Sequence, residues 1–239
     1  MKTIKKQIIA LLPTITVVYA ITANDFINQN DCDQIIEKNY LNICYDYNLK
    51  APKAVSYTLR GDEVNELNIE DRPSFEIERT IAREYRASYS DYTYSGYDRG
   101  HLAPDASFDW SYESLEEVYS LANIIPQARK VNRYTWTKAE RYARFIAVQL
   151  GQVNVINVVK YSDIPLRIGE HGIAVPSGYY KVLYSDDQNF TKCLYYTNDN
   201  NITTQDDRLT HHQVDCNELL PAVPVTDFAF LIPILMPLN

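Results

Sequence analysis

A small set of polar side chains in this 239-residue chain has the types and spacing that phosphodiester hydrolysis requires. His101 closes the stretch Asp98-Arg99-Gly100-His101, at the expected end of a strand. Asn132, Glu140 and Arg144 follow on a predicted helix, separated by multiples of four residues. Because residues four apart lie on one face of an α-helix, the amide, the carboxylate and the guanidinium should point the same way.

Hydrolysis of a phosphodiester needs a base for the water, a counter-charge for the phosphoryl oxygens and a means to stabilise the leaving alkoxide. A neutral imidazole suits the first task, because its ordinary pKa lies near neutral pH. A divalent cation suits the other two, and an Asn132 side chain offers the hard oxygen that Mg²⁺ prefers. Glu140 can orient the water around such a cation. Arg144 and Arg72 can grip phosphate oxygens with forked donors.

Each of these residues also has a purely structural interpretation. His101 could be an interior histidine with both ring nitrogens satisfied. Asn132 could cap a helix. Glu140 and Arg144 could form only a surface ion pair one turn apart, worth a few tenths of a kcal/mol. Trp136, on the same face, is expected in the core.

The element that must carry Asn132, Glu140 and Arg144 is a helix over 128–150. Small and apolar residues recur there at helical spacing before Gly151, a suitable stop: Ala139, Ala143, Ile146, Ala147 and Leu150. A short strand at Ile124 and Ile125 precedes the helix. The site is therefore expected in a strand–loop–strand–helix unit spanning roughly 92–150.

The remaining segments predict a chain of mixed α and β structure without repeats or linkers. Apart from the long irregular surface segment at 60–90, they are short helices and strands: helices at 32–37 and 113–120, and strands at 43–45, 54–59, 153–160, 174–184 and 194–196. The predicted fold class is α+β, with a central antiparallel sheet flanked by helices.

The N-terminus has the pattern of a secretory signal peptide. A basic start without acidic residues precedes a short apolar run, Ile8 to Ala20, and small residues follow. The run is shorter than the ~20 residues of a membrane span and contains Pro13. We therefore predict a signal peptide at 1–23, one domain at 24–239, a secreted or periplasmic location and no stable membrane insertion after the signal is removed. An uncleaved anchor is the alternative.

The four cysteines predict two disulfides. They all lie beyond the apolar N-terminal run, and their number is even. We favour pairing Cys32 with Cys44 and Cys193 with Cys216, since both pairs close local loops. No two of them have the close spacing of zinc ligands.

The overall charge of −8 excludes a protein that coats nucleic acid by charge alone. An enzyme with a local basic cleft remains compatible with it, because turnover matters more than tight binding. The 20 tyrosines are typical of half-buried sheet surfaces, with platforms for base stacking as the alternative.

Two motifs resemble those of the DNA/RNA non-specific endonucleases, within the ββα-metal nuclease superfamily. The first is the stretch from Gly96 to His101, followed by Leu102-Ala103-Pro104, which resembles the DRGH motif. The second runs from Asn123-Ile124-Ile125-Pro126-Gln127 to Asn132, Trp136, Glu140 and Arg144. Weaker similarities cover much of the remaining chain, at 55–59, 71–75, 173–182 and 226–228. One departure is Ala122, where the family often has serine.

The resemblance implies a role for each site residue. His101 is similar to the general base, Asn132 to the single direct protein ligand of the metal, and Glu140 to the residue that orients the metal's water. Arg144 and Arg72 are similar to the family's phosphate-contacting arginines, and Arg99 is similar to the motif arginine beside the metal site. The implied cofactor is Mg²⁺, with Mn²⁺ or another divalent cation as the alternative. Asp98 and Asn123 are expected to be mainly structural.

The predicted function is that of an exported, metal-dependent endonuclease. It would cut DNA and RNA without sequence specificity and leave 5′-phosphate ends. The main alternative is a catalytically weak extracellular nucleic-acid-binding protein of the same fold. A structural module of the cell envelope and a phosphodiesterase for small substrates are two further alternatives. The sequence carries no signal for oligomeric state.

Overall fold

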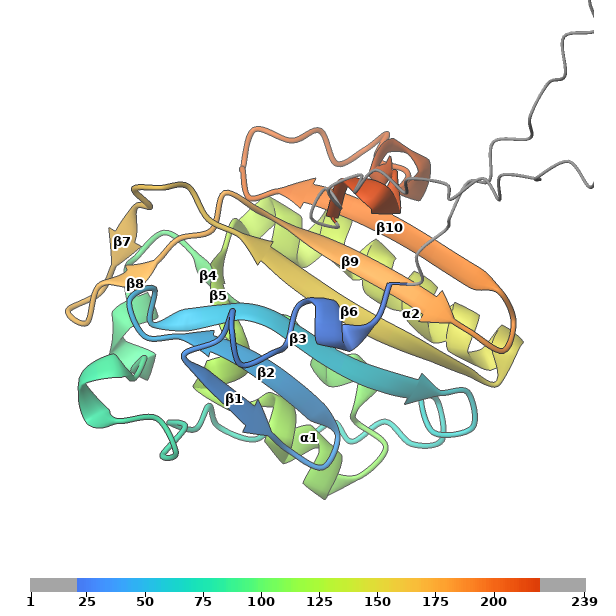
Figure 1. Cartoon of the computed structure of the whole chain (residues 1–239), viewed down its shortest axis with the longest axis horizontal. Coiled ribbons are helices and arrows are strands. Elements are labelled where there is room, and N and C mark those ends of the chain that lie inside the picture. Colours follow the sequence, from blue (N-terminus) through green and yellow to red (C-terminus); the bar gives the residue numbers. More distant parts are fainter. Residues whose placement is uncertain (1–20, 220–239) are drawn as a thin grey trace, which may run out of the picture.

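The computed structural model describes residues 21–219 and is built on a seven-stranded antiparallel sheet (Figure 1). The strand order is β1-β2-β3-β6-β9-β10-β11. The strands are β1 (Gln34–Glu37), β2 (Leu41–Asp46), β3 (Ala51–Arg60), β6 (Gln152–Lys160), β9 (Gly178–Ser185), β10 (Phe190–Thr197) and β11 (Gln213–Val214). The predicted α+β class with a large antiparallel sheet is confirmed.

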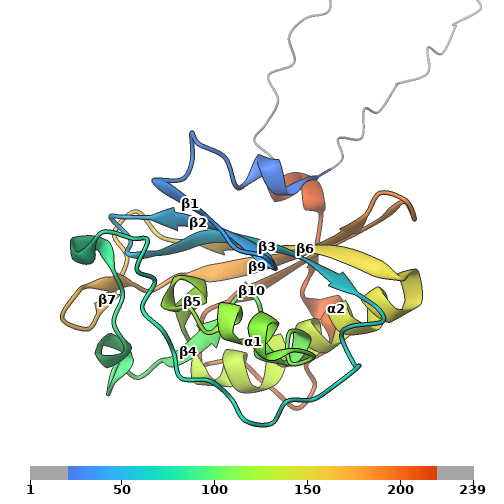
Figure 2. The same cartoon turned by 90° about the horizontal axis from the view of Figure 1, so that it is seen from below.

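Both α-helices, α1 (Tyr112–Val118) and α2 (Trp136–Leu150), lie on the same face of the sheet. Figure 2 shows that face together with the hairpin of β4 (Asp98–His101) and β5 (Ile124–Gln127). A second small pair, β7 (Arg167–Ile168) and β8 (Ile173–Ala174), lies at one end of the sheet. The helices therefore cover one side, rather than both sides, of the predicted sheet.

The other helical elements are short. Seven are 3₁₀ turns: η1 (Ala23–Asp25), η2 (Arg83–Tyr85), η3 (Tyr89–Tyr92), η4 (Asp105–Ser107), η5 (Leu121–Asn123), η7 (Leu209–His211) and η8 (Cys216–Leu219). The eighth, η6 (Val131–Thr135), is a π-helical turn that leads directly into α2.

The main core lies between the sheet and α2. Alternate strand residues point to this face, and α2 presents alanines at Ala139, Ala143 and Ala147, all buried. Such small side chains let the helix approach the sheet closely. At the start of α2 the fully buried Trp136 packs edge-on against Tyr179 and Tyr196, with ring centroids 4.8 and 5.3 Å away. The predicted helix and its core face are confirmed.

The N-terminal part of the described chain differs from expectation at 32–37. The predicted short helix there is wrong, because Gln34–Glu37 forms the edge strand β1, paired with β2. Tertiary pairing outweighs the weak local preference for helix. Cys32 is held against Cys44 of β2 by a disulfide, which places the following residues alongside that strand.

The second face of the sheet is covered by chain segments near both ends of the described range. Ile21 is buried there against Ile156, Val182 and Tyr184. Most of the predicted signal peptide lies outside the described residues, and the boundary at residue 23 stays a prediction. A cut after residue 23 would remove Ile21 from this packing. Within 21–219, no helix has the length and apolar character of a membrane span.

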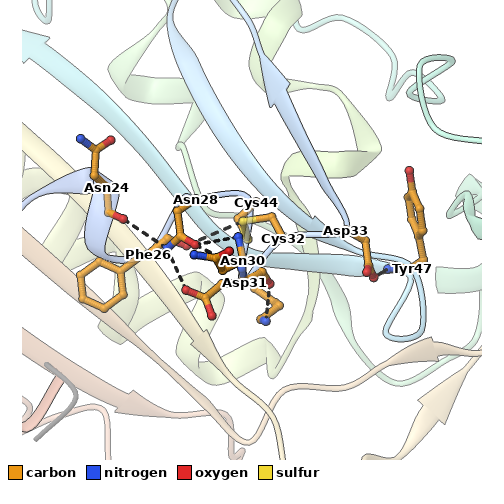
Figure 3. The surroundings of a disulfide bond; sticks show 10 residues. Asn24, Phe26, Asn28, Asn30, Asp31, Cys32, Asp33, Cys44 and Tyr47 are labelled. Carbon is orange, nitrogen blue, oxygen red and sulfur yellow. Dashed lines mark hydrogen bonds between the residues drawn. A yellow bond between two sulfur atoms is a disulfide. The ribbon is translucent and has the colours of Figure 1, made fainter.

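Both predicted disulfides are present, Cys32–Cys44 and Cys193–Cys216. Figure 3 shows the first beside a turn in which Asn28 Oδ1 accepts hydrogen bonds from the backbone N–H groups of Asn30 and Asp31. Each bond closes a local loop, of sequence separation 12 and 23 respectively.

Removing either disulfide should destabilise the fold. We expect Cys32→Ser with Cys44→Ser to lower the free energy of unfolding by about 3 kcal/mol, because a closed loop restricts the unfolded chain. Replacing both Cys193 and Cys216 with serine should lower the free energy of unfolding by ~0.6 kcal/mol more than that, since their loop is about twice as long. Urea unfolding of each double variant without reductant measures both values, with the reduced wild type as control. An unchanged unfolding midpoint would contradict the expectation.

Candidate active site

The hairpin that carries His101 pairs β4 with β5 in antiparallel register, with His101 opposite Ile124. Asn123 fixes the chain immediately after the histidine. Its Oδ1 accepts from the Ala103 N–H at 2.9 Å, and its Nδ2 donates to the carbonyls of Ala103 and Val118 at 2.9 and 2.8 Å. The buried Asn123 therefore has the structural role expected of it, which is to hold the end of β4 against the start of β5.

Gly100 is needed because the buried Gln127 side chain crosses it. A Cβ added at Gly100 would lie 2.0 Å from Gln127 Oε1 and 2.4 Å from Gln127 Cβ. Real Cβ atoms do not approach that closely, so the hairpin requires a glycine next to its histidine.

Gly100→Ala should therefore destabilise the protein by about 1 to 3 kcal/mol, the usual cost of overpacking a buried site. Urea unfolding measures this cost. Gln127→Gly removes both contacted atoms, so the combined variant should cost less than the sum of the two single changes. Simple additivity of the two costs would show that the predicted contact does not occur.

The His101 ring packs against Phe75 and Tyr119, with ring centroids 5.3 and 4.9 Å away, and those two rings also contact each other at 4.9 Å. Its Nε2 is buried and has no hydrogen-bond partner among the described residues. Burial lowers the pKa of His101 to about 4; the Asp105 carboxylate opposes this shift and the Arg72 guanidinium adds to it. The imidazole is therefore neutral at ordinary pH, and the interpretation as a satisfied interior histidine does not fit its unpaired nitrogen.

Arg72 is brought near His101 but is already bound to two carboxylates. Its Nε lies 3.3 Å from Asp105 Oδ2, and its Nη2 lies 3.1 Å from Asp109 Oδ2. Its Nη1 also donates to the Ile69 carbonyl. Arg72 therefore affects His101 through its charge, and a phosphate would have to compete with Asp105 and Asp109 for its donors.

Arg99 extends over aromatic rings beside the histidine. Its Cζ lies 3.7 Å from the Tyr89 ring centroid and 5.6 Å from that of Phe75, which also contacts His101. Its Nε is buried without a partner in the described part of the chain. The cation–π contacts hold the guanidinium in place while leaving donors free.

Asn132 lies in the π-helical turn, and Asp98 of β4 fixes its orientation. Asn132 Nδ2 donates to Asp98 Oδ2 at 3.1 Å, and the same carboxylate accepts from Arg133 Nε and Nη2 at 2.7 and 2.8 Å. Burial opposes ionisation of Asp98, but the hydrogen bonds from Arg133 and Asn132 outweigh it and keep its pKa below the ordinary value. With the amide nitrogen bound, the Asn132 oxygen is the end available to a cation.

Glu140 and Arg144 follow on successive turns of α2, both half-buried. Arg144 Nη1 donates to Ser107 Oγ at 3.3 Å. Glu140 forms no salt bridge within residues 21–219, so the interpretation as a surface ion pair does not apply. Burial raises the pKa of Glu140 to about 7, against the opposing charges of Lys181 and Arg144.

Sequence reasoning missed Phe75 and Tyr119, which pack against the His101 ring and against each other. Asp98, which was expected to be mainly structural, orients Asn132. Phe75 belongs to the irregular segment, whose path no periodic pattern predicts. Its only signal was the weak family similarity at 71–75.

The donor set favours one type of metal binding. Within the described range, no cluster of three or more His, Cys, Asp or Glu side chains could hold a metal ion. A zinc or two-metal centre needs such a cluster. A free Asn132 oxygen fits instead a hard cation that keeps most of its own water.

The hairpin with His101 and the helical segment with Asn132 together form one candidate site on an α+β fold. The sequence model of the DNA/RNA non-specific endonucleases matches residues 20–230, and the chain belongs to that family. Members of the family are in general divalent-metal-dependent nucleases.

Curated relatives and a solved structure agree with this assignment. Human "Endonuclease G, mitochondrial" is 28% identical over 155 residues, covering 59% of this chain and 51% of its own length. "Mitochondrial nuclease" of Saccharomyces cerevisiae is 26% identical over 157 residues, covering 60% and 48%. In the crystal structure of the EndoG/EndoGI complex, a chain 24% identical superposes with a TM-score of 0.69, covering 77% of this chain and 81% of that one. That likeness shows the fold.

The comparisons correct one prediction. The relatives are mitochondrial nucleases by name, which points to the mitochondrion, so the predicted secreted or periplasmic location is wrong. The chain spans about half the length of these curated relatives.

Proposed function

We propose that this protein is a metal-dependent endonuclease that hydrolyses DNA and RNA without sequence specificity. One observation carries the proposal: His101 presents a buried, unpaired Nε2 on the strand whose Asp98 binds Asn132. A neutral imidazole with a free nitrogen is the group that a general base requires. The free oxygen of Asn132 is the ligand that a hydrated hard cation requires.

In the reaction that this geometry supports, His101 accepts a proton from water as the water oxygen attacks phosphorus. The bond from phosphorus to the 3′ oxygen breaks, and the leaving 3′ alkoxide takes a proton from solvent water, which gives a 5′-phosphate and a 3′-hydroxyl. Asn132 would hold the divalent cation, Mg²⁺ or alternatively Mn²⁺, which supplies charge neutralisation at the leaving oxygen when bound. Glu140 orients water at the site, and Arg99 and Arg144 contact the phosphate, with Arg72 as a further candidate.

The main alternative is a catalytically weak protein that binds nucleic acid through the same fold. The structure retains the unpaired His101 nitrogen and the oriented Asn132 amide, neither of which mere binding requires. These two features favour the enzyme.

Digestion of plasmid DNA, single-stranded DNA and RNA tests the proposal. We expect cleavage of all three in Mg²⁺ and none in excess EDTA, with activity restored by added Mg²⁺. The products should accept label from polynucleotide kinase only after phosphatase treatment, because their 5′ ends carry phosphate. Nucleic-acid binding without cleavage at any Mg²⁺ or Mn²⁺ concentration would overturn the proposal in favour of the binding protein.

A further inference from the structure

A lysine lies buried in the sheet beneath the candidate active site. Lys181 of β9 has no exposed surface, and its Nζ donates to Asn157 Oδ1 on β6 at 2.8 Å and to the Tyr57 hydroxyl on β3 at 3.4 Å. Nζ also lies 4.3 Å from the ring centroid of Trp136. Within residues 21–219 it forms no salt bridge. A buried ammonium without a paired carboxylate is costly, so its presence needs an explanation.

The hydrogen bonds of Lys181 connect the two halves of the site. Asn157, which accepts from Lys181, donates from Nδ2 to the Leu102 carbonyl at 2.7 Å. Leu102 follows His101 directly in the chain. On the other side of Nζ, Trp136 is the first residue of α2, one turn before Glu140. One continuous set of contacts therefore runs from the strand of the base to the helix of the carboxylate.

The charge of Lys181 acts on Glu140. Among the charged groups that affect this carboxylate, Lys181 has the largest influence, and it opposes the rise in the pKa of Glu140 that burial causes. Glu140 in turn opposes the fall in the pKa of Lys181 that burial causes. The other charged or titratable groups around Glu140 are Arg144 and Arg141 on α2, Asp105 after β4, and Tyr57, Tyr179 and Tyr196 on the sheet.

We propose that Lys181 is a positioning residue of the nuclease site, which fixes the first turn of α2, the helix of Glu140, relative to the strand of His101. The proposal rests on the nuclease function proposed above. Lys181 is fully buried, so it does not contact the substrate, and it acts through its contacts with Asn157 and Trp136 and through the effect of its charge on Glu140. A methionine would fill the same space without the cost of a buried charge, which is why a purely structural role explains the lysine poorly.

Two variants at this position test the inference, and a third is the matched control. Lys181→Met removes the charge and the donors, whereas Lys181→Gln removes the charge and can still donate to Asn157. Lys192→Met is the control, since Lys192 on β10 also lies over an aromatic ring of α2, at 5.3 Å from Tyr142. For each folded variant, kcat and KM for DNA are measured from pH 5 to 9, and folding is checked by urea unfolding.

We expect both Lys181 variants to lower kcat at neutral pH by about 10- to 100-fold, the usual effect of losing a second-sphere partner. KM should not change, because Lys181 does not touch the substrate. The acidic limb of the kcat profile should move to higher pH, because Glu140 loses the charge that favours its ionised form. Lys192→Met should match the wild type in kcat, in KM and in the pH dependence of kcat.

Folded Lys181 variants whose kcat and pH profile match those of Lys192→Met would overturn the inference. If Lys181→Met does not fold, Lys181→Gln decides alone. If neither folds, the lysine is a determinant of the fold rather than of turnover, and the inference is wrong. Wild-type protein without activity would instead refute the nuclease proposal, so the two failures are distinguishable.

Discussion

Replacing His101 with alanine should lower kcat on DNA by at least ~100-fold, the usual contribution of a general base. The ring packs against Phe75 and Tyr119, and its Nε2 has no protein partner within the described residues, so no hydrogen bond inside the protein is lost with it. Folding should therefore persist, at the cost of a small cavity. Plasmid nicking rates give the change in kcat, and urea unfolding gives the stability.

A matched control for this variant is His171→Ala. Unlike His101, His171 contacts a carboxylate, with Nδ1 3.0 Å from Asp91 Oδ1, and it lies outside the candidate site. It should leave kcat near the wild-type value. Added imidazole should restore part of the activity of His101→Ala, because the free base can occupy the space that the His101 ring leaves beside Phe75 and Tyr119. Near-normal nuclease activity in His101→Ala would remove His101 from the mechanism.

Replacing Asn132 with alanine should weaken binding of the divalent cation by at least ~10-fold. The substitution removes the oxygen that the hydrogen bond from Nδ2 to Asp98 leaves free. Titration with Mn²⁺, followed by electron paramagnetic resonance in the absence of nucleic acid, measures the affinity without relying on activity. The Mg²⁺ concentration for half-maximal cleavage should rise in parallel.

Two further variants make the Asn132 result specific. Asn154→Ala removes an amide from the other face of the sheet, where Asn154 Oδ1 accepts from the Thr58 hydroxyl, and should leave cation binding unchanged. Asp98→Asn keeps the Asn132 oxygen but removes the carboxylate that orients it, so its effect should be intermediate. A Mn²⁺ affinity of Asn132→Ala equal to that of Asn154→Ala would refute the assignment of the ligand.

The sequence predicted those parts of the fold and the site that depend on local pattern. The alanines at 139, 143 and 147 predicted the buried face of α2, and the motif around His101 predicted the hairpin. Contacts between distant segments were not predictable, because no spacing rule relates Asp98 to Asn132 or Lys181 to Trp136. The strand at Gln34–Glu37 was missed for a related reason: its pairing with β2 decides its structure.

The predicted location is wrong because a basic start followed by an apolar run predicts a secretory signal, whereas the relatives are mitochondrial by name. The roles of the individual site residues rest on the family motif and on their geometry. They stay predictions until the variants above are measured.

The two edge strands of the large sheet are short, and a disulfide lies next to each of them. One edge strand is β1, which is four residues long and follows Cys32. The other is β11, which is two residues long and precedes Cys216. Each disulfide joins the chain beside an edge strand to the neighbouring inner strand, which is β2 for the first and β10 for the second. A free strand edge is the usual starting point for edge-to-edge aggregation. Short edge strands that are held by disulfides leave little backbone for another molecule to pair with. We therefore expect this protein not to aggregate at high concentration, as long as both disulfides remain oxidised.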